Sequence, residues 1–162
     1  MTTIRCMLAG LVALAIAILL FIPDVAQAQD AMKKPPALVG TWRVTFERPP
    51  GLPGLALVTF TSDGTSVRTT DRSPMMSASH GVWKQVGERE FQATWNAFQF
   101  NDKGAHVGNQ KASFVVRFGS DLDSFSGDCD GTNMTLDGTV TGKVVGPFQG
   151  TRVALEPYVK PQ

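Results

Sequence analysis

The chain is poor in the residues that carry most metal and redox chemistry. Its 162 residues include two cysteines, two histidines and one tyrosine, and its formal net charge is +1. Cys6 lies in an N-terminal segment that we expect to be removed, so the mature chain keeps Cys129 alone and cannot form an internal disulfide. No basic stretch remains that could neutralise a row of phosphates, so we expect no nucleic-acid partner.

Motifs for catalytic or phosphate-binding sites are also missing. No serine lies in a G-x-S-x-G pattern, and no glycine-rich loop precedes a helix. His80 and His106 lack a second histidine or a carboxylate at the spacing of a zinc or iron site. We interpret His80 as hydrogen-bonded to backbone at a strand entry, with a general base or metal ligand as the alternative, and His106 as solvent-exposed. Cys129 is expected to face inward as a small buried hydrophobe. We therefore predict no catalytic residue, no metal and no cofactor.

The one long hydrophobic run is at the N-terminus. Arg5 precedes an unbroken apolar stretch at residues 7–22, and Pro23 and an Ala-Gln-Ala pattern at 26–28 follow it. A basic residue, an apolar core and a small-residue cleavage site are typical of a secretory signal, and the run is short for a bilayer span of about 20 residues. We expect residues 1–28 to be a signal peptide, with an uncleaved anchor as the alternative. The mature protein is then secreted or periplasmic.

One domain is expected beyond this leader. Residues 29–37 are polar, contain two consecutive prolines and are predicted to form a flexible tether. Residues 38–157 form the predicted domain, and residues 158–162 form a C-terminal tail. The mature chain of about 134 residues is long enough to bury a substantial core. We expect a monomer that has no stable membrane anchor after cleavage.

Apolar and polar residues alternate with a period of two through most of this domain. In the WRVTF stretch at 42–46, every second residue is bulky and apolar. Polar turns such as Asp63-Gly64 separate the segments, and no window contains an apolar stripe of helical period. Seven or eight strands joined by short turns predict an antiparallel meander.

A meander leaves two unpaired edges, and closing the sheet removes both. The predicted fold class is all-β, an antiparallel up-and-down barrel of about eight strands, with a β-sandwich as the alternative. Phe98 and Phe100 have the opposite parity to Trp95 in the same predicted strand. A bulge near residues 96–97 would restore them to the inner face, and such bulges help barrels to close.

The G-T-W stretch at 40–42 and the T-R pair at 151–152 resemble the lipocalin-like, or calycin, group of small secreted up-and-down barrels. The chain as a whole also looks like uncharacterised bacterial secreted proteins of this type. The resemblance implies a structural plug, in which Trp42 closes one end of the barrel and Arg152 stacks on its ring. It further implies that Gly40 lets neighbouring backbone approach the ring.

Inward-facing aromatic side chains are expected to line a ligand cavity, namely those of Phe60, Trp83, Trp95 and Phe118. Thr69 and Gln85 are candidate inward polar groups. The favoured function is therefore the binding of a small apolar or amphipathic molecule in the barrel interior. Two alternatives remain: a filled barrel that serves as a structural or interaction scaffold, and a cyclase- or isomerase-like enzyme that uses the cavity.

The mouth of this cavity is expected at the end opposite Trp42. The turns at 63–64, 87–89 and 119–121 are predicted to ring it, with two of the cavity phenylalanines just beneath. Met75 and Met76, in the longest predicted loop, are then assigned to packing at the closed end or to a surface patch.

The position of the cleavage site can be tested on exported protein. Cleavage after Ala28 gives a mature chain that begins at Gln29, because small residues at the end of the leader are what the signal peptidase accepts. N-terminal sequencing of protein from periplasm or medium checks this, and Ala28→Tyr should leave the precursor uncleaved. Protein with an intact Met1 in the membrane fraction of the unaltered chain would contradict the prediction.

Overall fold

The computed structural model of the protein describes residues 36–48, 51–72, 74–158 and 160. The expected leader and nearly all of the expected tether lie outside these residues. Within the described residues, no helix has the length and apolar character needed to cross a membrane.

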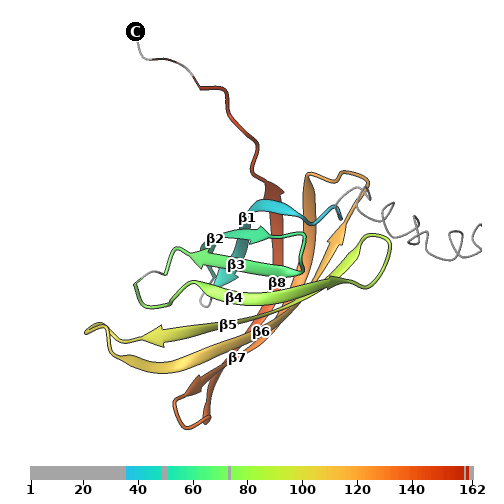
Figure 1. Cartoon of the computed structure of the whole chain (residues 1–162). Helices are drawn as coiled ribbons and strands as arrows, with labels where there is room; N and C mark the ends of the chain where they lie inside the picture. Colours follow the sequence, from blue (N-terminus) through green and yellow to red (C-terminus); the bar gives the residue numbers. More distant parts are fainter. Residues whose placement is uncertain (1–35, 49–50, 73, 159, 161–162) are drawn as a thin grey trace, which may run out of the picture. The chain divides into compact units, whose positions relative to one another are not determined.

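Eight antiparallel strands close into one barrel, in which each strand pairs with its neighbours in chain order and β1 pairs with β8 (Figure 1). The strands are β1 (Gly40–Arg48), β2 (Leu52–Phe60), β3 (Thr65–Thr70), β4 (Ser79–Gln85), β5 (Glu90–Phe100), β6 (His106–Phe118), β7 (Ser124–Thr135) and β8 (Val140–Arg152). Strands β5 to β8 have 11 to 13 residues, whereas β1 to β4 have 6 to 9. The predicted fold class is confirmed.

Two hairpins close through the same local pattern, T-x-D-G-T, at 61–65 and 135–139. In the first, Gly64 has a φ of 86° and the carboxylate of Asp63 accepts the backbone N–H of Thr65 at 2.9 Å. The second turn repeats both features. Glycine supplies the positive φ, and the aspartate satisfies a backbone donor that the turn would leave unpaired. These connections are therefore specified by a few adjacent residues.

β5 continues through the position where a bulge was expected. It keeps one register with β6 across residues 96–97 as far as Gln99, and the register shifts only between Gln99 and Phe100. The expected bulge near 96–97 is therefore wrong. Phe98 faces outward, is 57 % exposed and lies with its ring centroid 5.1 Å from that of His106. The apolar character of a side chain did not decide its face, because the continuous strand pairing fixes the parity.

Four aromatic side chains lie against glycines on the neighbouring strand. These cross-strand pairs are Phe46 with Gly54, Trp95 with Gly81, Phe125 with Gly150, and Phe148 with Gly127. At each of these glycines, a Cβ atom would overlap the partner's ring. The glycines are thus required by close approach and not by their backbone conformation. Pairing a large ring with a glycine across the ladder also allows the strong curvature that a small barrel needs.

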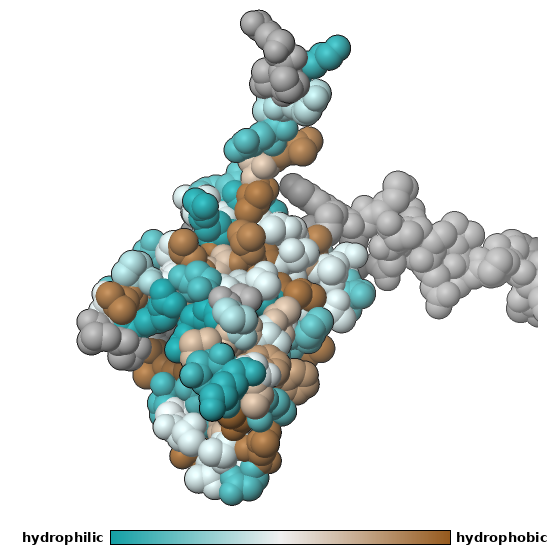
Figure 2. Space-filling view, turned by 90° about the vertical axis from the view of Figure 1, so that its left-hand side faces the viewer, coloured by the Kyte–Doolittle hydropathy of each residue, from teal (hydrophilic) through white to brown (hydrophobic). Residues whose placement is uncertain are grey.

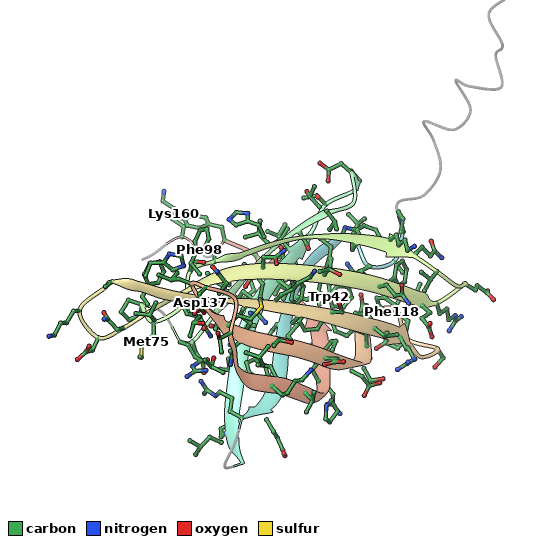
Figure 3. The ribbon with its side chains drawn as sticks, turned by 90° about the horizontal axis from the view of Figure 1, so that it is seen from below. Trp42, Met75, Phe98, Phe118, Asp137 and Lys160 are labelled. Atoms are coloured by element: carbon green, nitrogen blue, oxygen red, sulfur yellow. The ribbon has the colours of Figure 1, made fainter. Side chains whose placement is uncertain are left out.

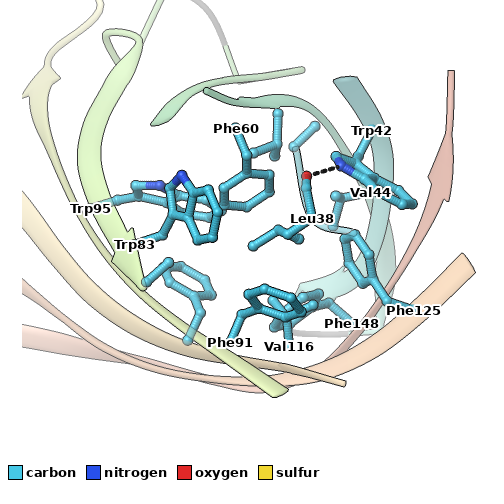
Figure 4. Close-up of a cluster of buried hydrophobic side chains, with 14 of the residues drawn as sticks. Leu38, Trp42, Val44, Phe60, Trp83, Phe91, Trp95, Val116, Phe125 and Phe148 are labelled. Carbon is cyan, nitrogen blue, oxygen red and sulfur yellow. Dashed lines mark hydrogen bonds between the residues drawn. The ribbon is translucent and has the colours of Figure 1, made fainter. Parts of the chain in front are cut away.

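Much of the barrel interior is occupied by aromatic rings that contact one another in a closed circuit. In order around the circuit these are Trp42, Phe118, Phe91, Trp83, Phe60, Trp95, Phe114, Phe148 and Phe125, which returns to Trp42. Successive ring centroids are 4.1 to 6.1 Å apart, mostly with tilted or edge-on planes. Leu38, which is completely buried, packs among these side chains (Figure 4). Such aromatic pairs stabilise by about 0.5–1.5 kcal/mol each beyond the area they bury.

The close approach of rings to glycines predicts that alanine substitution lowers stability at one glycine and not at another. Gly150→Ala should lower the free energy of unfolding by about 1–3 kcal/mol, because the new methyl group meets the ring of Phe125. Gly119→Ala is the matched control, since Gly119 has open space at its Cβ and no positive φ. Urea denaturation followed by tryptophan fluorescence measures both, and equal stabilities would contradict the account of the glycines.

Candidate functional site

One end of the barrel is closed by Trp42. The side chain is fully buried, and its Nε1 donates to the carbonyl oxygen of Leu38 at 2.8 Å (Figure 4). The guanidinium carbon of Arg152 lies 4.2 Å from the centroid of the Trp42 ring, within the range of a cation–π contact. Arg152 also donates to the carbonyl oxygens of Ala37 at 2.7 Å and Val39 at 3.0 Å. It therefore joins the segment before β1 to the end of β8.

Arg152 further connects this end to the turn between β6 and β7. It donates to the carbonyl oxygen of Leu122 at 3.0 Å and forms an ion pair of 2.8 Å with Asp123. Gly40 has a φ of 132°, and a Cβ atom there would lie 2.8 Å from Nη1 of Arg152. Gly40 thus makes room for the guanidinium group, whereas the resemblance implied room for backbone beside the tryptophan ring.

The tight turn at 63–64 lies at the same end as Trp42. Gly40, at the start of β1, pairs with Phe60, the last residue of β2, so the turn that follows β2 returns to this end. The turns after β4 and β6 return to it by the same alternation. The mouth that we expected these turns to ring is therefore at the plugged end, and the expectation was wrong.

The loop between β3 and β4 lies at the other end. Figure 3 shows Met75 and Phe98 at the opposite end from Trp42 and Phe118. Met76, next in the loop, is buried. An up-and-down barrel returns to a given end after every second strand, so the loop after the third strand is opposite the start of the first. The methionines therefore belong to the end away from the plug.

A small cavity lies inside the barrel, partly open to solvent. Its volume is about 60 Å³, which is room for several water molecules. Its wall is mostly apolar and includes the side chains of Val44, Ala56, Val58, Phe114 and Phe148. The ionisable side chains among its lining residues are those of Arg68, Glu47 and Cys129. An apolar wall with a few polar groups is the usual composition of a small-molecule site.

Of the four aromatic residues expected to line a cavity, the structure places Trp95 on this wall. Phe60, Trp83 and Phe118 pack ring against ring within the aromatic circuit. The indole N–H of Trp83 donates to two backbone carbonyl oxygens of the β2–β3 turn, at 3.0 and 3.1 Å. These three side chains therefore fill the plugged half of the barrel, and the cavity is in the other half.

The cavity lies beneath the place where β1 and β8 separate. Their pairing ends at Phe46 with Phe148, and β8 continues before that point paired with β7 alone. The next pair would join Glu47 to Pro147, and a proline has no N–H to donate. A surface depression of about 390 Å³ is lined by Phe46, Glu47, Pro147 and Phe148, which also line the cavity. This opening in the barrel wall is called the β1–β8 seam below.

Arg68 is the cation of the cavity. It lies on β3, the one strand without a ring in the aromatic circuit, and its guanidinium carbon is 5.1 Å from the centroid of the Trp95 ring. Its Nε donates to Oγ of Ser79 at 3.2 Å, and its Nη2 donates to Oε1 of Gln110 at 3.0 Å. Burial lowers the pKa of Arg68 to about 10, which leaves it charged at neutral pH.

The sequence did not indicate that Arg68 faces inward, because Arg68 is charged and its neighbour Val67 is apolar. The strand pairing places Arg68 opposite Val58, which is completely buried, so Arg68 faces inward while Val67 is 43 % exposed. Thr69 and Gln85, the expected inward polar groups, are both exposed. Counting residues across the turn after β2 would have found the correct face, since partners in adjacent strands share a face.

Cys129 faces the cavity from β7 and is partly buried. Its thiol lies 3.4 Å from the carbonyl oxygen of Val144. Desolvation by burial raises the pKa of this thiol to about 11, so it is protonated at neutral pH. A thiol in this state is a poor nucleophile, which fits the expected role as a small buried residue.

Both histidines are exposed. His80 lies on β4, and His106 at the start of β6 has its Nε2 3.0 Å from the carbonyl oxygen of Gly108. In the described ranges, no three histidine, cysteine, aspartate or glutamate side chains gather closely enough to hold a metal ion. The cavity is therefore the feature with the composition of a binding site.

No protein-family model matches this chain, and a search of curated proteins finds no match. Eight antiparallel strands closed into an up-and-down barrel agree with the calycin-like fold that the resemblance implied.

The contact between Trp42 and Arg152 predicts that substitutions of these two residues have coupled effects on the free energy of unfolding. Trp42→Ala should lower the free energy of unfolding by about 3–5 kcal/mol as a large-to-small core change. Arg152→Ala should cost less, and the double variant should cost less than the sum, because each removes one partner of the same contact. Thermal denaturation of the four proteins measures the coupling.

Arg117→Ala is the control for loss of an arginine, since Arg117 makes its ion pairs on the outer surface. It should have a much smaller effect than Arg152→Ala. If Trp42→Ala does not fold, Trp42→Phe takes its place in the cycle. Additive losses in the cycle would contradict a plug made by the two residues together.

Proposed function

We propose that this protein binds a small apolar or amphipathic molecule in the cavity beneath the β1–β8 seam. The observation that carries the proposal is the apolar cavity itself, in a barrel whose other half is packed solid with aromatic rings. An eight-stranded barrel is just wide enough to be filled by side chains or to hold one small ligand. In this barrel, one half is filled by side chains and the other half contains a cavity.

The size of the cavity limits what it can hold. Room for several water molecules is enough for one end of a chain-shaped molecule. The rest of such a ligand would lie in the depression along the seam, against Phe46 and Pro147. Transfer of its methylene groups from water would contribute about 0.8 kcal/mol each.

The aromatic circuit supports a second candidate function, a filled scaffold. Each of the three tryptophans donates its indole N–H to a protein acceptor, so the fold holds these large side chains in place. A barrel of this kind would present its outer face to a partner and would bind nothing inside. The test below separates the two functions.

We further propose that the protein works outside the cytoplasm, as a lipocalin-like, calycin-type secreted barrel. The leader pattern at residues 1–28 and the contact of Trp42 with Arg152 support this proposal.

Calorimetric titration with n-octanol tests binding in the interior. The folded protein should bind it saturably, with a dissociation constant near 0.1 mM, about what a ligand of this size reaches. Ala56→Leu should weaken binding at least about tenfold, because Ala56 lines the cavity and the larger side chain fills it. Leu57→Ala, which changes the outward-facing neighbour on the same strand, should leave binding unchanged.

Circular dichroism should show that both variants keep the strand content of the parent. If n-octanol does not bind, the filled scaffold replaces the proposal. If binding is unaffected by Ala56→Leu, the ligand binds elsewhere and the cavity is not the site.

A further inference from the structure

We propose that the ligand of this cavity is an amphipathic carboxylate, and that Arg68 binds its carboxylate group. This inference rests on the proposed function, since it names the chemical class of the ligand for the same site. It is carried by the position and partners of the Arg68 side chain.

Arg68 differs from the arginines that form ion pairs in this structure. Arg48, Arg117 and Arg152 each lie within 3.2 Å of an aspartate or glutamate oxygen. Arg68 forms no ion pair with any carboxylate of the described part of the chain, although it lines an interior cavity. Its interactions are with neutral groups, which are Oγ of Ser79, Oε1 of Gln110, Sδ of Met76 and the ring of Trp95.

A charge in this position has lost part of its hydration, and its partners in the described residues are neutral groups. Removing a charged group from water is costly unless an opposite charge or several hydrogen bonds replace the water. Nη1 of Arg68 donates to no described residue, whereas Nε and Nη2 both do. The guanidinium group therefore retains donors for a further acceptor in the cavity.

The guanidinium group is also held in place before any ligand arrives. The side-chain amide of Gln110 donates to Oδ1 of Asn133 at 3.0 Å, which leaves Oε1 of Gln110 to accept from Arg68. Gln99 donates to the same Asn133 oxygen at 2.9 Å. Gln110 is 6 % exposed, so this chain of hydrogen bonds is largely shielded from water. A preorganised cation binds an anion with little further loss of side-chain entropy.

The other ionisable groups of the cavity are a buried thiol and a carboxylate at its solvent-exposed edge. The thiol of Cys129 is neutral at neutral pH, as its raised pKa shows. Glu47 lines the cavity at the seam, is exposed to solvent and forms no ion pair with Arg68. A planar carboxylate can accept two parallel N–H bonds from a guanidinium group, while the apolar wall takes the hydrocarbon chain.

Three ligands that share one chain and differ in head group test this inference on the unaltered protein. These are n-octanoate, n-octanol and n-octylamine, each titrated calorimetrically at neutral pH. We expect octanoate to bind at least about tenfold more tightly than octanol, as a charge-assisted pair provides, and octylamine to bind most weakly. Equal affinities for octanoate and octanol would overturn the carboxylate inference and leave the proposed function standing. Binding of none of the three would overturn the proposed function itself.

Variants of Arg68 then assign the effect to this side chain. In Arg68→Met, octanoate should bind at least about tenfold more weakly while octanol changes less than about threefold, so the preference for the acid is lost. Arg68→Lys keeps the charge but loses the forked donors, and should show an intermediate affinity for octanoate. Arg43→Met, on the exposed face of β1, is the matched control and should bind octanoate as the parent does.

A preference for octanoate that survives in a folded Arg68→Met variant would overturn the role of Arg68. If that variant does not fold, the head-group series on the parent and the Arg68→Lys result decide the question. Octanoate binding by Arg68→Lys as tight as by the parent would then count against recognition by the guanidinium group.

Discussion

The closed circuit of aromatic rings is the interaction on which the rest of the barrel depends. Seven of the eight strands each contribute one or two of its rings, so the circuit joins strands that are far apart in the chain. The glycines opposite Trp95, Phe125 and Phe148 follow from it, because the neighbouring backbone must pass close to rings that point into so narrow a space. Closure of the sheet and packing of the core therefore depend on each other, and no disulfide supports them in the described part of the chain.

β3, the strand that contributes no ring to the circuit, places polar and charged side chains in the barrel interior. β3 places Ser66 and Arg68 on the inner face, and the indole N–H of Trp95 donates to Oγ of Ser66 at 2.6 Å. Arg68 lies over the same indole ring and joins the hydrogen-bonded side chains of Gln110 and Asn133. Of these two polar residues, Arg68 lines the cavity in the half of the barrel that the rings do not fill.

Unequal strand lengths open this half to the surface. β8 has 13 residues and β1 has 9, so part of β8 runs on without β1 beside it. The separation occurs where Gly146, with a φ of 146°, precedes Pro147. Both residues stay paired with β7, whereas the pairing with β1 ends here, where Pro147 lacks a donor for a further bond. The plug, the filled half and the seam thus follow one another along the barrel.

The sequence by itself determined the elements and several of their contacts, because these depend on neighbouring residues. Period-two alternation and turns such as Asp63-Gly64 specify strands and hairpins. The plug of Trp42 and Arg152, which lie far apart in the chain, was instead implied by the resemblance to calycin-type barrels. Alternation also gave the inward face of Phe60, Trp83, Trp95 and Phe118, but for other residues only the tertiary structure decided the face. Phe98 faces solvent and Arg68 faces the core because the pairing of each strand with the next fixes its face, whatever the polarity of one side chain. The cavity likewise exists only where β1 and β8, the first and last strands, meet and part. No local pattern encodes the point at which β1 and β8 separate, since it depends on how nine rings from seven strands pack in one interior.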